Sequence, residues 1–182
     1  FTKTMMELSI KNCDKLIVDS NFSKDEIVNL LNINLNKVYV IYLGVDDKYI
    51  DNKKNENYIK DFVYEDYILS VLSCVKYHNI INLLKAFKLF KNEYQMNLRF
   101  LLVLQILDKD YYHEICEYIK NNFFKNEIII FNSLDNKYLI NLYKRAKFYI
   151  FSSYSEVFGF TSLEAMSQNC PVVISKRSSL PE

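Results

Sequence analysis

The stretch FYIFSSYSEVFGFTSLEAM, residues 148–166, decides the fold, because an acidic loop and a glycine join a short apolar run to a helix-forming segment. Phe148–Phe151 are apolar without interruption, which is typical of a strand buried on both faces of a parallel sheet. Leu163, Ala165 and Met166 favour a helix. In open α/β sheets, ligands bind beyond the carboxyl ends of strands, where helices present N–H groups without partners. We therefore expect a binding site in this loop.

The same alternation of strand and helix is repeated from residue 67 onward. Strands that alternate with helices of about 10–15 residues form right-handed βαβ units around a parallel sheet. The predicted fold class is therefore α/β, a Rossmann-like doubly wound parallel sheet. Strands are expected at 67–73, 98–104, 127–131, 147–151 and 171–174, and helices at 79–93, 109–122, 135–146 and 159–168.

A smaller group of elements precedes this region and is separated from it by a polar segment. Residues 47–66 are rich in Asp, Asn, Lys and Glu and have little apolar periodicity, so we expect a linker there. Ser23–Glu26 has the pattern of a capping box that opens a helix. Strands are expected on either side of that helix, at 15–19 and 38–42, and the expected domains are 1–46, the linker 47–66, and 67–182.

The composition is that of a folded protein with reduced thiols. Half of the 182 residues are hydrophobic, and a net charge of +1 gives no indication of a nucleic-acid partner. The four cysteines have no metal-site spacing, so we expect no metal and a cytoplasmic protein. No apolar run approaches the about 18 residues of a membrane span. Because the chain begins at Phe1 without an initiator methionine, we expect a fragment of a longer protein.

Glu156 and Glu164 stand on either side of Gly159 and could form one site. Side chains on a helix lean toward its N-terminus, so Glu164 can point back to the loop that contains Glu156. Amides near Gly159 would bind an anion, and the carboxylates would accept hydrogen bonds from vicinal diols, a combination found in nucleotides and nucleotide sugars. The alternative is two solvated glutamates favoured by the helix dipole. Gly159 favours the binding site, because a glycine at such a turn suggests positive φ or a close ligand.

The run from Tyr143 through Glu156 to Glu164, continuing to Pro171–Val173, resembles the donor-site signature of the family 4 glycosyltransferases, including their E-x7-E motif. These are retaining enzymes with the two-domain GT-B fold. Other segments of the chain resemble further parts of this family. By this resemblance the chain covers the end of the acceptor domain and most of the donor-binding domain. The supporting segments are 14–20 with 22–24, 41–46, 67–69, 79–80, 86–87 and 175–182.

The resemblance implies a role for each carboxylate. Glu156 would meet the hydroxyls of the donor sugar as a catalytic residue, and Glu164 would bind the ribose diol. The implied reaction transfers a sugar from a nucleotide-diphosphate sugar to an unknown polysaccharide, lipid or glycan acceptor, with no cofactor and normally no metal. The other expected donor-binding residues are Ser73, Val157, Phe158, Gly159, Phe160 and Thr161.

The leaving diphosphate requires positive charge nearby. The residues that supply this charge are where the chain departs most from the family motif. Where the family usually has a glycine, an arginine or other polar residue, and a lysine, this chain has Leu72, Ser73 and His78. Lys76 lies two positions before His78, and a histidine has an ordinary pKa of about 6.5. We expect both to act on the diphosphate, against the alternative that both are exposed loop residues without a role. Asn169 replaces a usual glycine, and asparagine tolerates left-handed backbone.

Two other functions are consistent with parts of the sequence. The first is a degenerate, non-catalytic nucleotide-binding module of the same fold, which the missing basic residues favour and the glutamate pair opposes. The second is an oxidoreductase or P-loop enzyme, but no G-x-G-x-x-G or G-K-[ST] sequence is present. We expect this fragment alone to be inactive. No transmembrane segment is expected, and the resemblance leaves peripheral contact with the cytoplasmic face of a membrane open.

Overall fold

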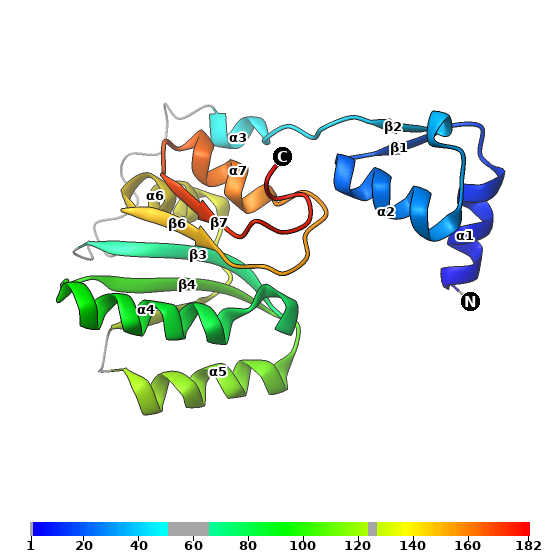
Figure 1. Ribbon diagram of the computed structural model, residues 1–182. Helices are drawn as coiled ribbons and strands as arrows, with labels where there is room; N and C mark the ends of the chain where they lie inside the picture. Colours follow the sequence, from blue (N-terminus) through cyan, green and yellow to red (C-terminus); the bar gives the residue numbers. More distant parts are fainter. Residues whose placement is uncertain (1, 51–65, 124–126) are drawn as a thin grey trace. The chain divides into compact units, whose positions relative to one another are not determined.

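The computed structural model describes residues 2–50, 66–123 and 127–182 (Figure 1). The chain divides into two compact units, and the short segments 155–159 and 176–182 belong to the unit that contains the N-terminal residues. The first unit comprises Phe1–Gly44, Ser155–Gly159 and Lys176–Glu182, and the second unit comprises Val45–Tyr154 and Phe160–Ser175.

The second unit is built around a five-stranded parallel sheet with the strand order β5-β4-β3-β6-β7. The chain enters at the central strand, extends the sheet to one edge, and then returns to extend it to the other edge. The doubly wound α/β prediction is confirmed. The strands are β3 Tyr67–Cys74, β4 Arg99–Ile106, β5 Ile128–Asn132, β6 Phe148–Phe151 and β7 Val172–Ile174.

Helices connect these strands and cover both faces of the sheet. Right-handed connections that run in opposite directions along a sheet place their helices on opposite faces, so α4 and α5 lie on one face and α6 and α7 on the other (Figure 1). The ends of the predicted strands and helices of this unit lie within two residues of those observed. The helices are α3 Asp47–Ile50, α4 Ile80–Tyr94, α5 Lys109–Asn122, α6 Asn136–Arg145 and α7 Phe160–Ser167, with a 3₁₀ turn, η2, at Lys76–His78.

The core of the second unit lies between the helices and the central strands. Four side chains of α4 recur at intervals of three and four residues and are all buried, which explains why this segment forms an amphipathic helix. On β4, Phe100–Leu104 is a continuous buried run, as expected for a strand with helices on both faces. The buried side chains of α4 are Ile80, Leu83, Leu84 and Phe87.

The expected linker at 47–66 begins with the helix α3, whose Tyr49 is buried in the second unit. The rest of that prediction, residues 51–65, lies outside the described residues. Asn169 adopts the left-handed backbone expected of it, with φ of 59°. Asparagine therefore ends the turn after α7 without a glycine.

The first unit contains a two-stranded parallel sheet, in which Leu16 pairs with Val38. The capping-box prediction at Ser23–Glu26 is wrong. The intervening helix begins at Asn21, and the side chain of Ser20 accepts a hydrogen bond from the Ser23 N–H at 3.1 Å. Ser20 has the extended backbone that an N-cap requires, whereas Ser23 is already inside the first turn. The elements are α1 Thr2–Asn12, β1 Leu16–Val18, α2 Asn21–Leu31, η1 Leu35–Lys37 and β2 Val38–Val40.

The start of α2 binds a carboxylate from a distant segment of the same unit. The backbone N–H groups of Asn21 and Phe22 donate to Glu182 at 2.8 and 2.7 Å, and the Tyr42 hydroxyl donates to the same carboxylate at 3.0 Å. Slight desolvation raises the pKa of Glu182, but these hydrogen bonds outweigh it and leave the pKa below its ordinary value. A negative charge at this position is also favoured by the dipole of the helix.

Candidate functional site

The strands β3 and β6 are neighbours in the sheet, yet the chain leaves them in opposite directions, so a topological switch point lies at their carboxyl ends. Ligands of open α/β sheets bind at such points. The two loops that follow these strands are joined by hydrogen bonds. The Tyr154 N–H donates to the Tyr77 carbonyl at 2.8 Å, and the Ser152 hydroxyl donates to the His78 carbonyl at 3.1 Å.

His78 is a buried residue of the loop after β3, with 6% of its surface exposed. Its Nδ1 lies 2.6 Å from the carbonyl oxygen of Ser73. Because a carbonyl only accepts, Nδ1 must carry a proton. The ring also meets Tyr77 edge-on at 4.5 Å between centroids. The alternative that His78 is an exposed loop residue is therefore wrong, whereas Lys76, at the start of η2, is exposed.

Glu164 lies in the second turn of α7 and is half-buried. The Tyr143 hydroxyl donates to its Oε2 at 3.1 Å, and the Tyr49 hydroxyl, which donates to Asn136 Oδ1 at 3.3 Å, also favours the ionised form of this carboxylate. Desolvation raises the pKa of Glu164, while the hydrogen bonds from Tyr143 and Tyr49 act in the opposite direction. Glu164 is therefore a partly desolvated carboxylate held by neutral donors.

Thr161 lies in the first turn of α7, and its hydroxyl accepts a hydrogen bond from the Tyr149 hydroxyl at 2.7 Å. The same tyrosine oxygen lies 3.1 Å from the carbonyl oxygen of Val71. Tyr149 therefore links the start of α7 to β3. Phe160, the first residue of this helix, is exposed.

The other predicted site residues belong to the first unit. The Glu156 N–H donates to the Ser178 hydroxyl at 2.7 Å, and the Ser179 hydroxyl donates to the Glu156 carbonyl at 2.9 Å, so the following loop fixes the main chain of Glu156. Gly159 has φ of 88°, which confirms the positive φ expected there. Val157 is exposed, and Phe158 and Glu156 are half-buried. Glu156–Gly159 thus belong to the first unit, and Ser73, Lys76, His78, Phe160, Thr161 and Glu164 to the second.

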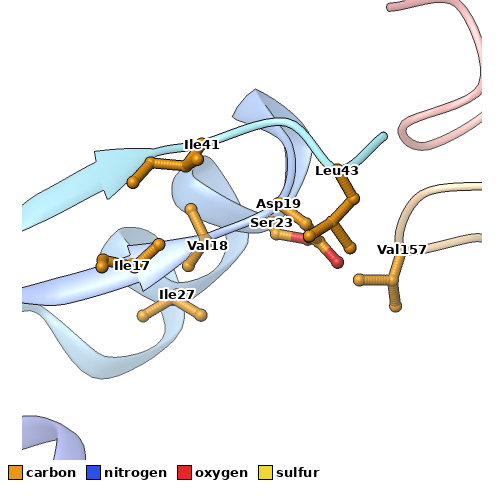
Figure 2. Close-up of a pocket in the computed structure, with 8 residues that line it drawn as sticks. All are labelled: Ile17, Val18, Asp19, Ser23, Ile27, Ile41, Leu43 and Val157. Carbon is orange, nitrogen blue, oxygen red and sulfur yellow. The ribbon is translucent and has the colours of Figure 1, made fainter. Parts of the chain in front are cut away.

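Sequence reasoning did not find the pocket of about 360 Å³ in the first unit (Figure 2). Its polar side chains are Asp19 and Ser23, which Figure 2 shows beside Leu43. None of the lining residues is cationic, so this pocket is unsuited to a diphosphate. The lining residues are Ile17, Val18, Asp19, Ser23, Ile27, Ile41, Leu43 and Val157.

Tyr49 and Tyr143 are the contacts of Glu164 to which sequence reasoning assigned no role. The apolar periodicity of residues 135–146 could have indicated a buried Tyr143, because a buried tyrosine hydroxyl needs a polar partner. Tyr49 gives no such signal, since it belongs to the short helix α3 within a polar segment.

Within the described residues, no three His, Cys, Asp or Glu side chains gather closely enough to bind a metal ion. The helices of residues 2–50, 66–123 and 127–182 include none with the length and apolar character needed to cross a membrane.

The five-stranded doubly wound sheet, with its switch point between β3 and β6, defines a Rossmann-like domain. Its family follows from the sequence: the chain belongs to the glycosyl transferases group 1, whose family model matches residues 51–182. This confirms the resemblance on which the site residues were chosen.

Two curated relatives are O-antigen chain mannosyltransferases. RfbU of Salmonella typhimurium is 25% identical over 176 residues, and mannosyltransferase B of Escherichia coli is 27% identical over 180 residues. Each alignment covers 96% of this chain and 46% of the relative. The chain thus spans about half the length of the curated relatives it matches.

Solved structures with the GT-B fold show the same architecture. A glycosyltransferase from Rickettsia africae superposes with a TM-score of 0.79 at 21% identity, covering 96% of this chain and 48% of that one. Sucrose-phosphate synthase from Thermosynechococcus elongatus superposes with a TM-score of 0.77 at 21% identity. The match covers 97% of this chain and 44% of that one. HepE from Anabaena, in complex with UDP and glucose, superposes with a TM-score of 0.77 at 16% identity. The match covers 93% of this chain and 46% of that one. The chain therefore has the fold of half of a GT-B glycosyltransferase.

Proposed function

We propose that the intact protein is a retaining glycosyltransferase that uses a nucleotide-diphosphate sugar, and that this chain provides most of its donor-binding domain. Membership of the glycosyl transferases group 1 supports the reaction class. Both curated relatives are named mannosyltransferases, and HepE is a neighbour in complex with UDP and glucose. Nucleotide-linked mannose and glucose are therefore the first donors to test.

The observation that supports donor binding most directly is the environment of Glu164. A carboxylate has about four acceptor positions, and the two tyrosine hydroxyls take only part of this capacity. The remaining positions suit the two hydroxyls of a ribose diol, which would replace the water lost on burial. A neutral diol needs such an acceptor, whereas a phosphate would be repelled by it.

The remaining roles are assigned from the family motif. Glu156 contacts the donor sugar hydroxyls and is the catalytic carboxylate. The backbone N–H groups of Val157–Phe160, with Thr161, bind the sugar or the distal phosphate. Ser73, Lys76 and His78 face the leaving diphosphate, where negative charge accumulates in the transition state. The reaction proceeds without a cofactor or a bound metal ion.

The acceptor and the cellular setting complete the proposal. The acceptor is a growing glycan, a polysaccharide or a lipid, and the enzyme acts in the cytoplasm, including the cytoplasmic face of a membrane. Because the chain spans about half the length of its relatives, transfer requires residues outside this chain. The fragment alone is expected to bind donor nucleotide without completing transfer.

Leu72 and Ser73 favour a second candidate, a degenerate module that binds nucleotide without catalysis, because they occupy the positions of residues that usually serve the diphosphate. The intact protein should be incubated with UDP-, GDP- and ADP-linked mannose and glucose, with nucleotide release and labelled product as readouts. Turnover that is lost in Glu156→Ala supports the enzyme. Saturable donor binding with no release in wild type would instead support the degenerate module.

A further inference from the structure

Three tyrosine rings, Tyr49, Tyr143 and Tyr149, form a buried cluster beside α7 in the second unit. Each is no more than 1% exposed, and the ring centroids lie 6.4 Å apart for Tyr49 and Tyr143 and 5.7 Å apart for Tyr143 and Tyr149. A buried tyrosine hydroxyl needs a polar partner. Tyr149 bonds to Thr161 and Tyr143 to Glu164, both on α7, whereas Tyr49 donates to Asn136 Oδ1 and also favours the ionised form of Glu164.

We propose that Tyr143 and Tyr49 are positioning residues that hold the Glu164 carboxylate in the orientation and ionised form that bind a ribose diol. This inference rests on the donor role proposed above for Glu164. Neither tyrosine contacts the nucleotide in this account. They act only through the carboxylate.

Neutral donors are suited to positioning Glu164 because they leave acceptor positions on its carboxylate for the hydroxyls of a diol. A guanidinium would bind both oxygens in a bidentate pair and cancel the charge. Each tyrosine hydroxyl offers a single proton, and that of Tyr49 is shared with Asn136 Oδ1 at 3.3 Å. Burial raises the pKa of Tyr143 and that of Tyr49, so both hydroxyls keep the proton that they donate.

The two tyrosines approach Glu164 from different elements and are fixed separately. Tyr143 lies near the end of α6, and α6 packs against α7. Tyr49 lies on α3, which also packs against α7, and its carbonyl accepts a hydrogen bond from the Gln168 side chain. Glu164 is therefore restrained by side chains from two separately packed helices. If the Glu164 side chain rotated, its carboxylate would lose these contacts.

The test compares Tyr143→Phe and Tyr49→Phe with Tyr67→Phe in the intact protein. Tyr67 is equally buried in the same unit, but its hydroxyl donates to the Leu142 carbonyl at 2.9 Å. Removing it therefore deletes a matched buried hydrogen bond away from Glu164. Two probes are used. The first is whichever of UDP, GDP and ADP binds most tightly, and the second is the 2′,3′-dideoxy form of that nucleotide, which lacks the diol. Calorimetry at several pH values gives the affinities.

We expect Tyr143→Phe to weaken binding of the nucleoside diphosphate by about 3- to 10-fold, the loss of one hydrogen bond, with little effect on the dideoxy form. Tyr49→Phe should have a smaller effect in the same direction, because its proton is shared. Tyr67→Phe should change neither affinity. Removing a donor should also raise the pKa of Glu164, so the loss of affinity on acidification should begin at higher pH in Tyr143→Phe than in Tyr67→Phe.

The inference and the proposed function fail in different ways. If Glu164→Ala weakens diol-dependent binding but Tyr143→Phe and Tyr49→Phe match Tyr67→Phe in affinity and pH profile, the positioning role is overturned and the donor role stands. If Glu164→Ala binds like wild type, the donor role is overturned and the positioning role falls with it. Should Tyr143→Phe unfold, Tyr49→Phe gives the same comparison.

Discussion

The carbonyl oxygen of Ser73 lies 2.6 Å from Nδ1 of His78 and closes the loop between β3 and α4 around a buried imidazole. This contact fixes the tautomer and the orientation of the ring at the switch point of the sheet. His78 is thus a buried side chain that is bonded to the main chain of its own loop.

If His78 serves the diphosphate, its replacement should affect phosphates selectively. Since Nδ1–H already donates to Ser73, His78 can donate to a phosphate only when Nε2 is also protonated. In that form, His78→Ala should weaken binding of a nucleoside diphosphate by about 10-fold, the value of one hydrogen bond to a charged group, and leave binding of the parent nucleoside unchanged. His113→Ala, at an exposed position of α5, is the control. Equal losses for nucleoside and diphosphate would show that His78 only supports the loop.

The two glycines of the chain predict opposite responses to the same substitution. Gly159 has φ of 88°, and an added Cβ would lie 2.7 Å from Leu180 Cδ2. Gly159→Ala should therefore destabilise the protein by about 1–3 kcal/mol. Gly44 has no heavy atom within 4 Å of an added Cβ, so Gly44→Ala should be neutral or stabilising by less than about 1 kcal/mol. Denaturant unfolding measures both, and similar values for the two variants would contradict this account.

Glu164 should reduce stability at neutral pH, because burial raises its pKa in the folded protein. A carboxyl whose pKa is raised in the folded state stabilises the fold most when it is protonated. This contribution to the free energy of unfolding is lost as the pH rises through the folded-state pKa. Glu164→Gln should thus be more stable than wild type at neutral pH, with the difference disappearing below about pH 4. Thermal unfolding from acidic to neutral pH measures this, with exposed Glu114→Gln as control. A constant difference across that range would contradict the prediction.

The four cysteines should divide into two classes of reactivity. Burial raises the pKa of the Cys74 thiol to about 11 and also raises that of Cys170, so both should resist alkylation near neutral pH. Cys13 and Cys116 are half-buried and should react first. Mass spectrometry after brief iodoacetamide treatment distinguishes the sites. Labelling of Cys74 in the native protein as fast as in denaturant would contradict its burial.

Much of the fold was predictable because it depends on local patterns. The apolar run at 100–104 and the helical period at 109–122 each specify one element, and their alternation specifies a parallel sheet. Gly159 was predictable for a similar reason, since few other residues adopt its backbone conformation.

The details that the sequence did not reveal depend on distant partners. Ser20 and Ser23 both suit an N-cap, and only the backbone distinguishes them. The burial of His78 depends on Phe151 at the end of β6, whose ring lies beside it, and on Ser152 in the following loop, which bonds to its carbonyl. Tyr49 reaches Glu164 through the packing of α3 against α7, which no spacing in the sequence encodes.

The central claim is that Glu164 contributes to a nucleotide site, and calorimetric titration of UDP, GDP and ADP into the intact protein tests it most directly. Wild type and Glu114→Ala should bind one of these nucleotides saturably. Glu164→Ala should bind it about 10-fold more weakly or worse, because hydrogen bonds between a charged group and the ribose diol are lost. Glu156→Ala should retain most of the affinity and lose turnover. Absence of saturable binding in wild type, or equal affinity in wild type and Glu164→Ala, would contradict the claim.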